Sequence, residues 1–241
     1  MTTPTAVTLV GATGLTGSHS LNCLLTSPHA FSINALTRRP LSDTPSAVNP
    51  LTKLTTRIYN SLFDAPTDKD ALVQQGGIYV SCLGTTRADA GGTAEQEKVD
   101  LGLNKDLATR AKKDGASTLI LVSSLGAASS SYFFYPRIKG QLEDAVKALD
   151  FDHTVILQPA VLLGDRAESR GISEIVLKGV IRGIRKVGLP VDSLAVEGAD
   201  IGACIAHLAA NPPSEKVLTI GDHEIIAYAK QYRAAQAQSS K

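Results

Sequence analysis

Three glycines at three-residue spacing place the strongest constraint on the fold of this 241-residue chain. Gly11, Gly14 and Gly17 follow a short apolar run over residues 6–10 and open a segment over residues 15–25 whose leucines have helical spacing. A strand that turns through glycines into a helix lets the backbone approach a pyrophosphate, which rests on the amides and the positive dipole end of the helix. The pattern therefore predicts a dinucleotide-binding turn, with a plain tight turn as the alternative. We expect three more residues of this turn to contact the ligand: Thr13, Leu15 and Thr16.

The remainder of the chain alternates short apolar runs with helical patterns. Strands are predicted over residues 31–36, 54–59, 78–83, 118–122, 154–157 and 216–220, and helices over residues 68–75, 95–113, 136–149, 172–187 and 199–210. Such alternation is typical of βαβ units, so we expect an α/β fold, a doubly wound (Rossmann) parallel sheet with helices on both faces. We predict a single domain over residues 1–230, with a small C-terminal substrate-side lobe mainly over residues 159–230, and a flexible tail over residues 231–241.

Composition excludes several classes of function. The 24 Lys and Arg residues nearly balance the 23 Asp and Glu residues, and aromatic residues make up only 5% with no Trp, which argues against a dedicated nucleic-acid binder. The three cysteines are odd in number and widely spaced, and the five histidines lack ligand spacing. We therefore expect no disulfide framework, no metal site and a reducing compartment.

The sequence offers no segment suited to membrane insertion or secretion. No apolar run reaches the roughly 18 residues that a transmembrane helix requires. The first charged residue is Arg38, so the N-terminal region lacks the basic residues of a signal peptide or a mitochondrial transit peptide. We expect a protein that is neither secreted nor integral to a membrane through a helix.

The pair Arg38 and Arg39 bears on which dinucleotide binds. In dinucleotide-binding folds an acid roughly 20 residues past the glycines holds the 2′-hydroxyl of NAD. Here Arg38 lies 21 residues past Gly17, and no acidic residue occurs before Asp43. A guanidinium suits a 2′-phosphate, so the sequence favours NADP(H), with two solvated surface arginines as the alternative. Asp64 follows the third strand, where it either meets the adenine edge or initiates a turn.

A tyrosine, a lysine and two serines form a candidate catalytic set. Tyr135 and Lys139 make a YxxxK motif at the start of a predicted helix, and Ser123 and Ser124 end the fifth predicted strand. Ligands of doubly wound sheets bind beyond the carboxyl ends of the strands, so these groups should meet beside the nicotinamide. A carbonyl that accepts hydride must be protonated, which a tyrosine does better when a nearby cation lowers its pKa. A serine hydroxyl would hold the substrate oxygen; the alternative is a surface pair without function.

Longer segments carry a resemblance to a known family. They are VGATGLTG at residues 10–17, CLGTTRADAGG at 82–92, VSSLGA at 122–127, FFYPRIKGQLEDAV at 133–146 and QPAVLLGDRAESR at 158–170. Over residues 8–228 the chain resembles the short-chain dehydrogenase/reductase superfamily. The resemblance is to its atypical branch, which contains the Tat-interacting oxidoreductase-like tumour suppressor and fungal mitochondrial outer-membrane proteins, and the fungal group is the closer match.

The resemblance implies an NADP-dependent oxidoreductase that transfers hydride between NADPH and a small carbonyl compound. Tyr135 would be the general acid and Lys139 its partner, with Ser123 or Ser124 as the third member and Ser123 favoured. Besides the glycine turn and the two arginines, the implied cofactor contacts are Cys82, Leu83, Gly84, Thr85, Lys139, Pro159 and Val161.

Two residues depart from the family pattern. Pro136 directly follows the tyrosine. We expect it at the first helical position, where it would bias Tyr135 away from helical dihedral angles. Asp100 stands where related extended reductases usually carry asparagine, which argues against a water relay at that position.

A second hypothesis is an NADPH-binding adaptor that acts through protein or mitochondrial-surface contacts with little catalysis. Its basis is the resemblance together with the predicted helix 172–187, which carries Lys178, Arg182, Arg185 and Lys186 on one face. The alternative for this helix is an ordinary solvated face over the substrate cleft. The resemblance also implies that the protein lies on the cytosolic face of the mitochondrial outer membrane. We expect a monomer or a homodimer, because related enzymes often pair through helices equivalent to 95–113 and 136–149.

Overall fold

A computed structural model describes residues 3–163 and 195–239 of the chain. Its main sheet is parallel, and the strands lie in the order β3-β2-β1-β4-β5-β6-β9. Their bounds are β1 Thr5–Val10, β2 Phe31–Thr37, β3 Lys53–Ile58, β4 Ile78–Ser81, β5 Thr118–Val122, β6 His153–Leu157 and β9 Val217–Ile220. A separate parallel pair joins β7 (Val161–Leu163) to β8 (Ala195–Glu197). The order around β1 and β4 is that of the doubly wound Rossmann sheet, so the predicted fold class is confirmed.

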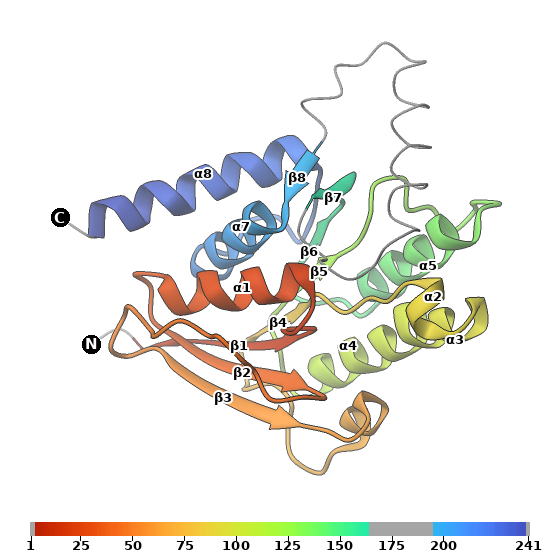
Figure 1. The fold of residues 1–241 in the computed structure, drawn as a ribbon, viewed down its shortest axis with the longest axis horizontal. Helices are drawn as coiled ribbons and strands as arrows, with labels where there is room; N and C mark the ends of the chain where they lie inside the picture. The colour runs from red at the N-terminus through yellow and green to blue at the C-terminus, as the bar shows by residue number, and fades with distance from the viewer. Residues whose placement is uncertain (1–2, 164–194, 240–241) are drawn as a thin grey trace.

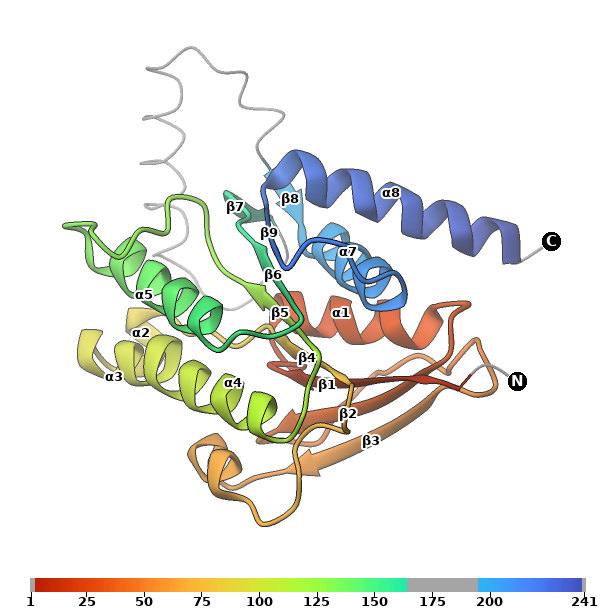
Figure 2. The same ribbon diagram turned by 180° about the vertical axis from the view of Figure 1, so that it is seen from behind.

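Helices cover both faces of the sheet (Figures 1 and 2). On one face lie α1 (Leu15–Thr26), α7 (Gly198–Ala210) and α8 (Asp222–Ser239), and on the other lie α4 (Asn104–Lys113) and α5 (Phe134–Ala148). The strands bury side chains on both faces. Val7 and Leu9 of β1 pack in the α1 core, whereas Val10 packs in the core under α4 and α5. Burial on both faces explains why central strands such as β4 and β5 are apolar runs rather than alternating patterns.

The predicted helix 95–113 is divided. It consists of α3 (Thr93–Glu97), a π-helical turn η2 (Lys98–Leu103) and α4, and the short helix α2 (Arg87–Ala90) precedes it. Single π-helical turns inserted in α-helices are frequent at functional sites. Asp100 lies in this turn.

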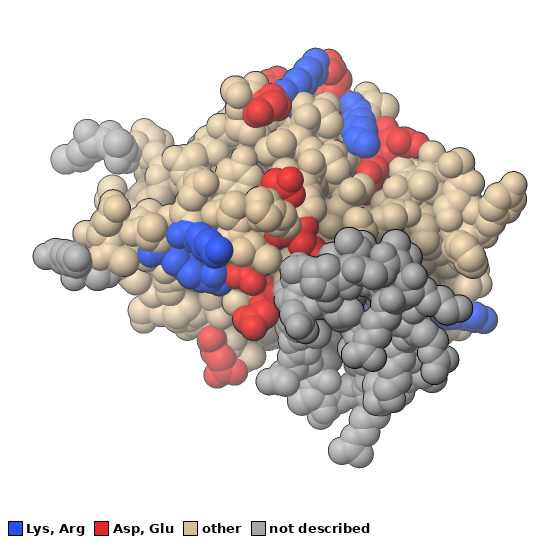
Figure 3. Space-filling model, turned by 90° about the horizontal axis from the view of Figure 1, so that it is seen from above, with Lys and Arg blue, Asp and Glu red and all other residues tan. Residues whose placement is uncertain are grey.

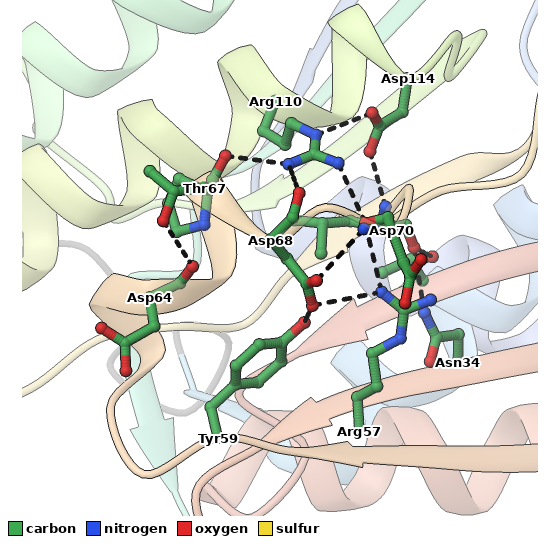
Figure 4. Close-up of polar contacts among 12 residues, drawn as sticks. Asn34, Arg57, Tyr59, Asp64, Thr67, Asp68, Asp70, Arg110 and Asp114 are labelled. Carbon is green, nitrogen blue, oxygen red and sulfur yellow. Dashed lines mark hydrogen bonds and ion pairs between the residues drawn. The ribbon is translucent and has the colours of Figure 1, made fainter.

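The predicted helix over residues 68–75 is wrong. A 3₁₀ helix η1 (Leu62–Thr67) precedes these residues, which themselves form no helix. The reason lies in α4, where Arg110 and Asp114 form an ion pair of 2.7 Å and bind the backbone of this segment (Figure 4). Arg110 donates to the carbonyls of Pro66, Asp68 and Asp70. Asp114 accepts the N–H of Leu72. These backbone groups are therefore bound by side chains instead of by helical partners.

The flexible tail expected over residues 231–241 is also wrong as far as the structure describes it. Helix α8 continues to Ser239 and packs against α7. Tyr232 is buried and donates to the carbonyl of Cys23 at 2.6 Å, and Gln236 donates to the carbonyl of Thr26 at 2.9 Å. The C-terminal helix is thus attached to α1. The predicted basic helix 172–187 lies outside the described residues.

Among the described residues, no helix has the length and apolar character needed to cross a bilayer. The same residues contain no group of three or more His, Cys, Asp or Glu side chains arranged to hold a metal ion.

Candidate active site and cofactor cleft

The glycine turn between β1 and α1 permits two close approaches of backbone to backbone. Gly11 has a φ of +83°, and a Cβ atom at this position would lie 2.6 Å from the carbonyl oxygen of Cys82. A Cβ atom on Gly17 would overlap the carbonyl oxygen of Gly11. The turn therefore requires glycine at both positions. In the described structure no side chain caps the N-terminus of α1, so its first amides are available to an anion.

A cleft of about 530 Å³ opens beyond the carboxyl ends of β1, β2 and β4. Its volume falls in the range of small-molecule sites. Ten of the predicted cofactor residues line it: Gly11, Thr13, Gly14, Leu15, Arg38, Arg39, Cys82, Leu83, Gly84 and Thr85. Five further residues of the lining were missed from the sequence: Ser18, Leu36, Thr37, Leu62 and Asp89. Leu36 and Thr37 could have been found, because they end the strand that leads to the arginine pair.

Other predicted cofactor residues lie outside this lining. Asp64 is exposed on η1, and its carboxylate points away from the polar cluster in Figure 4, whereas Leu62 of the same helix reaches the cleft. Thr16 and Gly17 are buried in α1. Pro159 follows β6 and accepts the N–H of Leu125. The backbone of Val161 begins β7.

Tyr135 and Lys139 both belong to α5. The helix begins at Phe134, so Tyr135 is its second residue and Pro136 its third. The expectation that Pro136 would occupy the first helical position, with Tyr135 before the helix, is therefore wrong. Proline is tolerated throughout the first turn because N–H groups there have no helical partner.

The pKa of Tyr135 is displaced in the direction opposite to the one expected. Burial of its hydroxyl end raises the pKa to about 12, with a further contribution from the Asp100 carboxylate, although the residue as a whole is 41% exposed. Lys139 is buried, and its Nζ donates to the carbonyl of Val122 at 3.1 Å. Burial lowers the pKa of Lys139, and the carboxylates of Asp100 and Glu143 oppose that effect.

The two serines have different surroundings. The Ser123 hydroxyl is buried and donates to Glu143 Oε1 at 2.5 Å. The Ser124 hydroxyl interacts with Tyr135 and donates to the carbonyl of Leu125 at 3.3 Å. The preference for Ser123 as the member of the catalytic set stays a prediction, and the surroundings of the two hydroxyls favour Ser124.

Two buried carboxylates flank Lys139. Asp100 is 1% exposed and Glu143 is 4% exposed. The amide of Gln158 donates to both oxygens of Glu143, at 2.9 and 3.0 Å. Glu143 was missed from the sequence, although its position one turn after Lys139 on the same helix places the two on one face.

Comparison with known proteins gives close relatives over nearly the whole chain, although no family model matches it. The protein named Fmp52, mitochondrial, from Aspergillus fumigatus is 38% identical over 231 residues, covering 92% of this chain and 97% of the relative. The protein of the same name from Candida albicans is 34% identical, covering 92% of this chain and 96% of the relative. The fmp-52 protein of Neurospora crassa is 38% identical and covers 88% of each.

Solved structures with the same fold share little sequence. The 3-oxoacyl-[acyl-carrier protein] reductase of Brucella melitensis, in complex with NAD, has a TM-score of 0.66 at 14% identity, covering 92% of this chain and 96% of its own. A putative NAD-dependent epimerase/dehydratase of Bacillus halodurans has a TM-score of 0.60 at 18% identity, covering 94% and 99%. The WbmG enzyme of Bordetella bronchiseptica, in complex with NAD, has a TM-score of 0.59 at 18% identity, covering 95% and 78%.

Proposed function

This chain belongs to the Fmp52 family, and we propose that it is an NADP-dependent oxidoreductase of the atypical short-chain dehydrogenase/reductase type. It would transfer hydride between NADPH and a small carbonyl compound, with Tyr135 as general acid. The observation that carries the proposal is the joint presence of an uncapped glycine turn, an arginine pair in the same cleft, and the interaction of Ser124 with Tyr135, which lies one helical turn before the buried Lys139 on α5.

The residues of the cleft fit a phosphorylated dinucleotide. The turn from Gly11 to Leu15 would hold the pyrophosphate on its backbone amides, because it lines the cleft and no side chain caps the N-terminus of α1 there. Arg38 and Arg39 would bind the 2′-phosphate of NADP. Two of the three solved structures named above are described in complex with NAD, which supports a nicotinamide dinucleotide as the ligand class. The bound cofactor would supply the hydride.

The catalytic residues would handle the oxygen of the substrate. The Ser124 hydroxyl would donate a hydrogen bond to the carbonyl oxygen, and Tyr135 would deliver a proton to it as hydride reaches the carbon, giving an alcohol. Lys139 uses one N–H on the Val122 carbonyl, which leaves two N–H donors to hold ribose hydroxyls of the cofactor.

The side chains near the tyrosine suit an uncharged substrate. Residues 123–136 contain no Asp, Glu, Lys or Arg. Leu125 and Phe133 expose 54% and 77% of their surfaces in this segment. On the face shown in Figure 3, few charged side chains lie at the end of the molecule where the loop before α5 projects. A small carbonyl compound without charge matches this surface better than a sugar nucleotide.

The test is a screen of aldehydes and ketones with NADPH that compares wild type, Tyr135→Phe and the control Tyr132→Phe. Removal of the general acid should lower kcat/KM by about 100-fold or more, while the Kd for NADPH and the control activity stay near wild type. Equal activity in wild type and Tyr135→Phe would refute the mechanism.

The adaptor hypothesis remains a second candidate because of one observation. Tyr132 is 97% exposed and Phe133 is 77% exposed on the loop before α5, and neither is needed for the core. An NADPH-binding adaptor would dock this loop on a partner or on the cytosolic face of the mitochondrial outer membrane. Tyr132→Ser with Phe133→Ser should then release the protein from the mitochondrial fraction without changing NADPH affinity. Unchanged fractionation would reject the candidate.

A further inference from the structure

Asp100 is a carboxylate buried inside the candidate site. It lies in the π-helical turn η2 and is 1% exposed. None of the described Lys and Arg side chains forms an ion pair with it. A buried carboxylate without a paired cation is costly, so hydrogen bonds and nearby charges must compensate for its burial.

The Asp100 carboxylate holds one wall of the cofactor cleft. The Thr85 N–H donates to Oδ1 at 2.8 Å. The amide of Gln96 donates to Oδ2 at 3.3 Å and to the Thr85 carbonyl at 3.2 Å. Both backbone polar groups of Thr85, a residue that lines the cleft, are thus fixed by Asp100 and Gln96. The Asn104 amide donates to the Asp100 carbonyl at 3.3 Å and anchors the turn itself.

The turn η2, which contains Asp100, packs against α5, the helix that carries Tyr135 and Lys139. The charge of Asp100 adds to burial in raising the pKa of Tyr135 and opposes burial in its effect on the pKa of Lys139. In both cases the charge favours the protonated form. The other titratable groups that face Lys139 are Glu143 on α5 and Cys82 after β4. Burial raises the pKa of the Cys82 thiol to about 12 and keeps it neutral.

We propose that Asp100 is a positioning residue that fixes the Thr85 wall of the cleft and keeps Tyr135 and Lys139 protonated, so that the site donates a proton to a carbonyl rather than accepting one from an alcohol. The catalytic consequence rests on the proposed function, whereas the protonation of the tyrosine is a property of the protein alone. Reduction needs the neutral phenol, so its rate persists below the pKa of Tyr135 and falls as pH rises through it. Removal of the Asp100 charge lowers the pKa values of both groups and moves this fall to lower pH.

The decisive variant is Asp100→Asn, because its side-chain oxygen still accepts the Thr85 N–H while the charge is lost. The matched control is Asp106→Asn, an exposed carboxylate on α4. The phenol carbon of Tyr135 is followed by ¹³C NMR during a pH titration, with its signal assigned by Tyr135→Phe. The tyrosinate should form at lower pH in Asp100→Asn than in wild type or in the control. In wild type, the Tyr135 tyrosinate should form at higher pH than the tyrosinate of a free tyrosine, whose pKa is about 10.

Two further measurements separate the effect of the Asp100 charge from the effect of its hydrogen bond to Thr85. Asp100→Asn should leave the Kd for NADPH within about twofold of wild type, while Asp100→Ala should weaken NADPH binding by about tenfold because the Thr85 N–H loses its partner. In an active preparation, kcat/KM for reduction should decrease as the pH rises, and in Asp100→Asn this decrease should occur at lower pH than in wild type. An unchanged Tyr135 titration in Asp100→Asn, or a wild-type Tyr135 that ionises at a pH no higher than a free tyrosine does, overturns the proposal. If no carbonyl compound is reduced, the proposed function fails while the NMR result still decides the role of Asp100.

Discussion

The different surroundings of Ser123 and Ser124 predict opposite effects of two adjacent alanine substitutions. Ser123 donates to the buried Glu143 carboxylate, and hydrogen bonds to charged groups contribute about 1.5–3 kcal/mol. Because Gln158 still donates to both oxygens of Glu143, Ser123→Ala leaves the carboxylate with partners, and the loss should be near the lower figure, about 1.5 kcal/mol. For a chain of this size that corresponds to a fall in Tm of about 3–6 °C.

Ser124→Ala should affect catalysis instead of stability. Its hydroxyl makes no bond to a buried charge and interacts with Tyr135, where the substrate oxygen would lie. Loss of one donor to a developing oxyanion should lower kcat/KM by about 100-fold, while Tm stays within about 2 °C of wild type.

The two variants serve as controls for each other in one pair of assays. Thermal unfolding gives the stability change, and the absorbance of NADPH during carbonyl reduction gives the rate. The reasoning is refuted by the reverse result, in which Ser123→Ala retains the wild-type Tm and loses activity while Ser124→Ala keeps it. That outcome would mean that the hydroxyl of Ser123 turns toward the substrate.

Three further predictions test the cofactor, the substrate and the fold. Replacement of both Arg38 and Arg39 by Ala should weaken NADPH binding by about 100-fold and leave NADH binding within about threefold, measured by fluorescence titration; equal losses for both cofactors would contradict a 2′-phosphate site. In a series of linear aldehydes from propanal to hexanal, kcat/KM should rise by about threefold per methylene group as apolar surface is buried, and a flat series or turnover of UDP-glucose would contradict an apolar rim. Arg110→Met should lower the free energy of unfolding by about 3 kcal/mol in urea denaturation, because Asp114 loses its half-buried partner and three carbonyls lose their donor. A loss under about 1 kcal/mol would show that the segment after η1 is held by other contacts.

The elements that the sequence predicted well are those whose pattern is local. Most strands of the main sheet are apolar runs bounded by polar or glycine residues, with the edge strand β3 as an exception, and the turn at Gly11 carries its own backbone requirement. The helix predicted over residues 68–75 was wrong because the backbone groups of this segment bind Arg110 and Asp114, about 40 residues further along the chain. The prediction of a flexible tail at the end of α8 was wrong for a similar reason. The Ala- and Gln-rich composition of this segment suggests fraying, but Tyr232 and Gln236 bind α1. Contacts made at such distances in sequence leave no periodic signal.

The face of the sheet on which each of the two serines lies is set by the alternation of side chains along β5. This alternation continues past the last paired residue of the strand. Leu119 and Leu121 of β5 pack in the core beneath α4 and α5, and Ile120 and Val122 pack in the opposite core. Continuation of this pattern by one residue turns Ser123 toward α5, where Glu143 accepts its hydrogen bond. Ser124 then lies beyond the sheet edge beside Tyr135. Counting residues back from the tyrosine could not distinguish the two serines, because the distance along the chain does not determine which face of the strand each one occupies. Alternation from Leu119 does distinguish them, once α5 is known to cover that face.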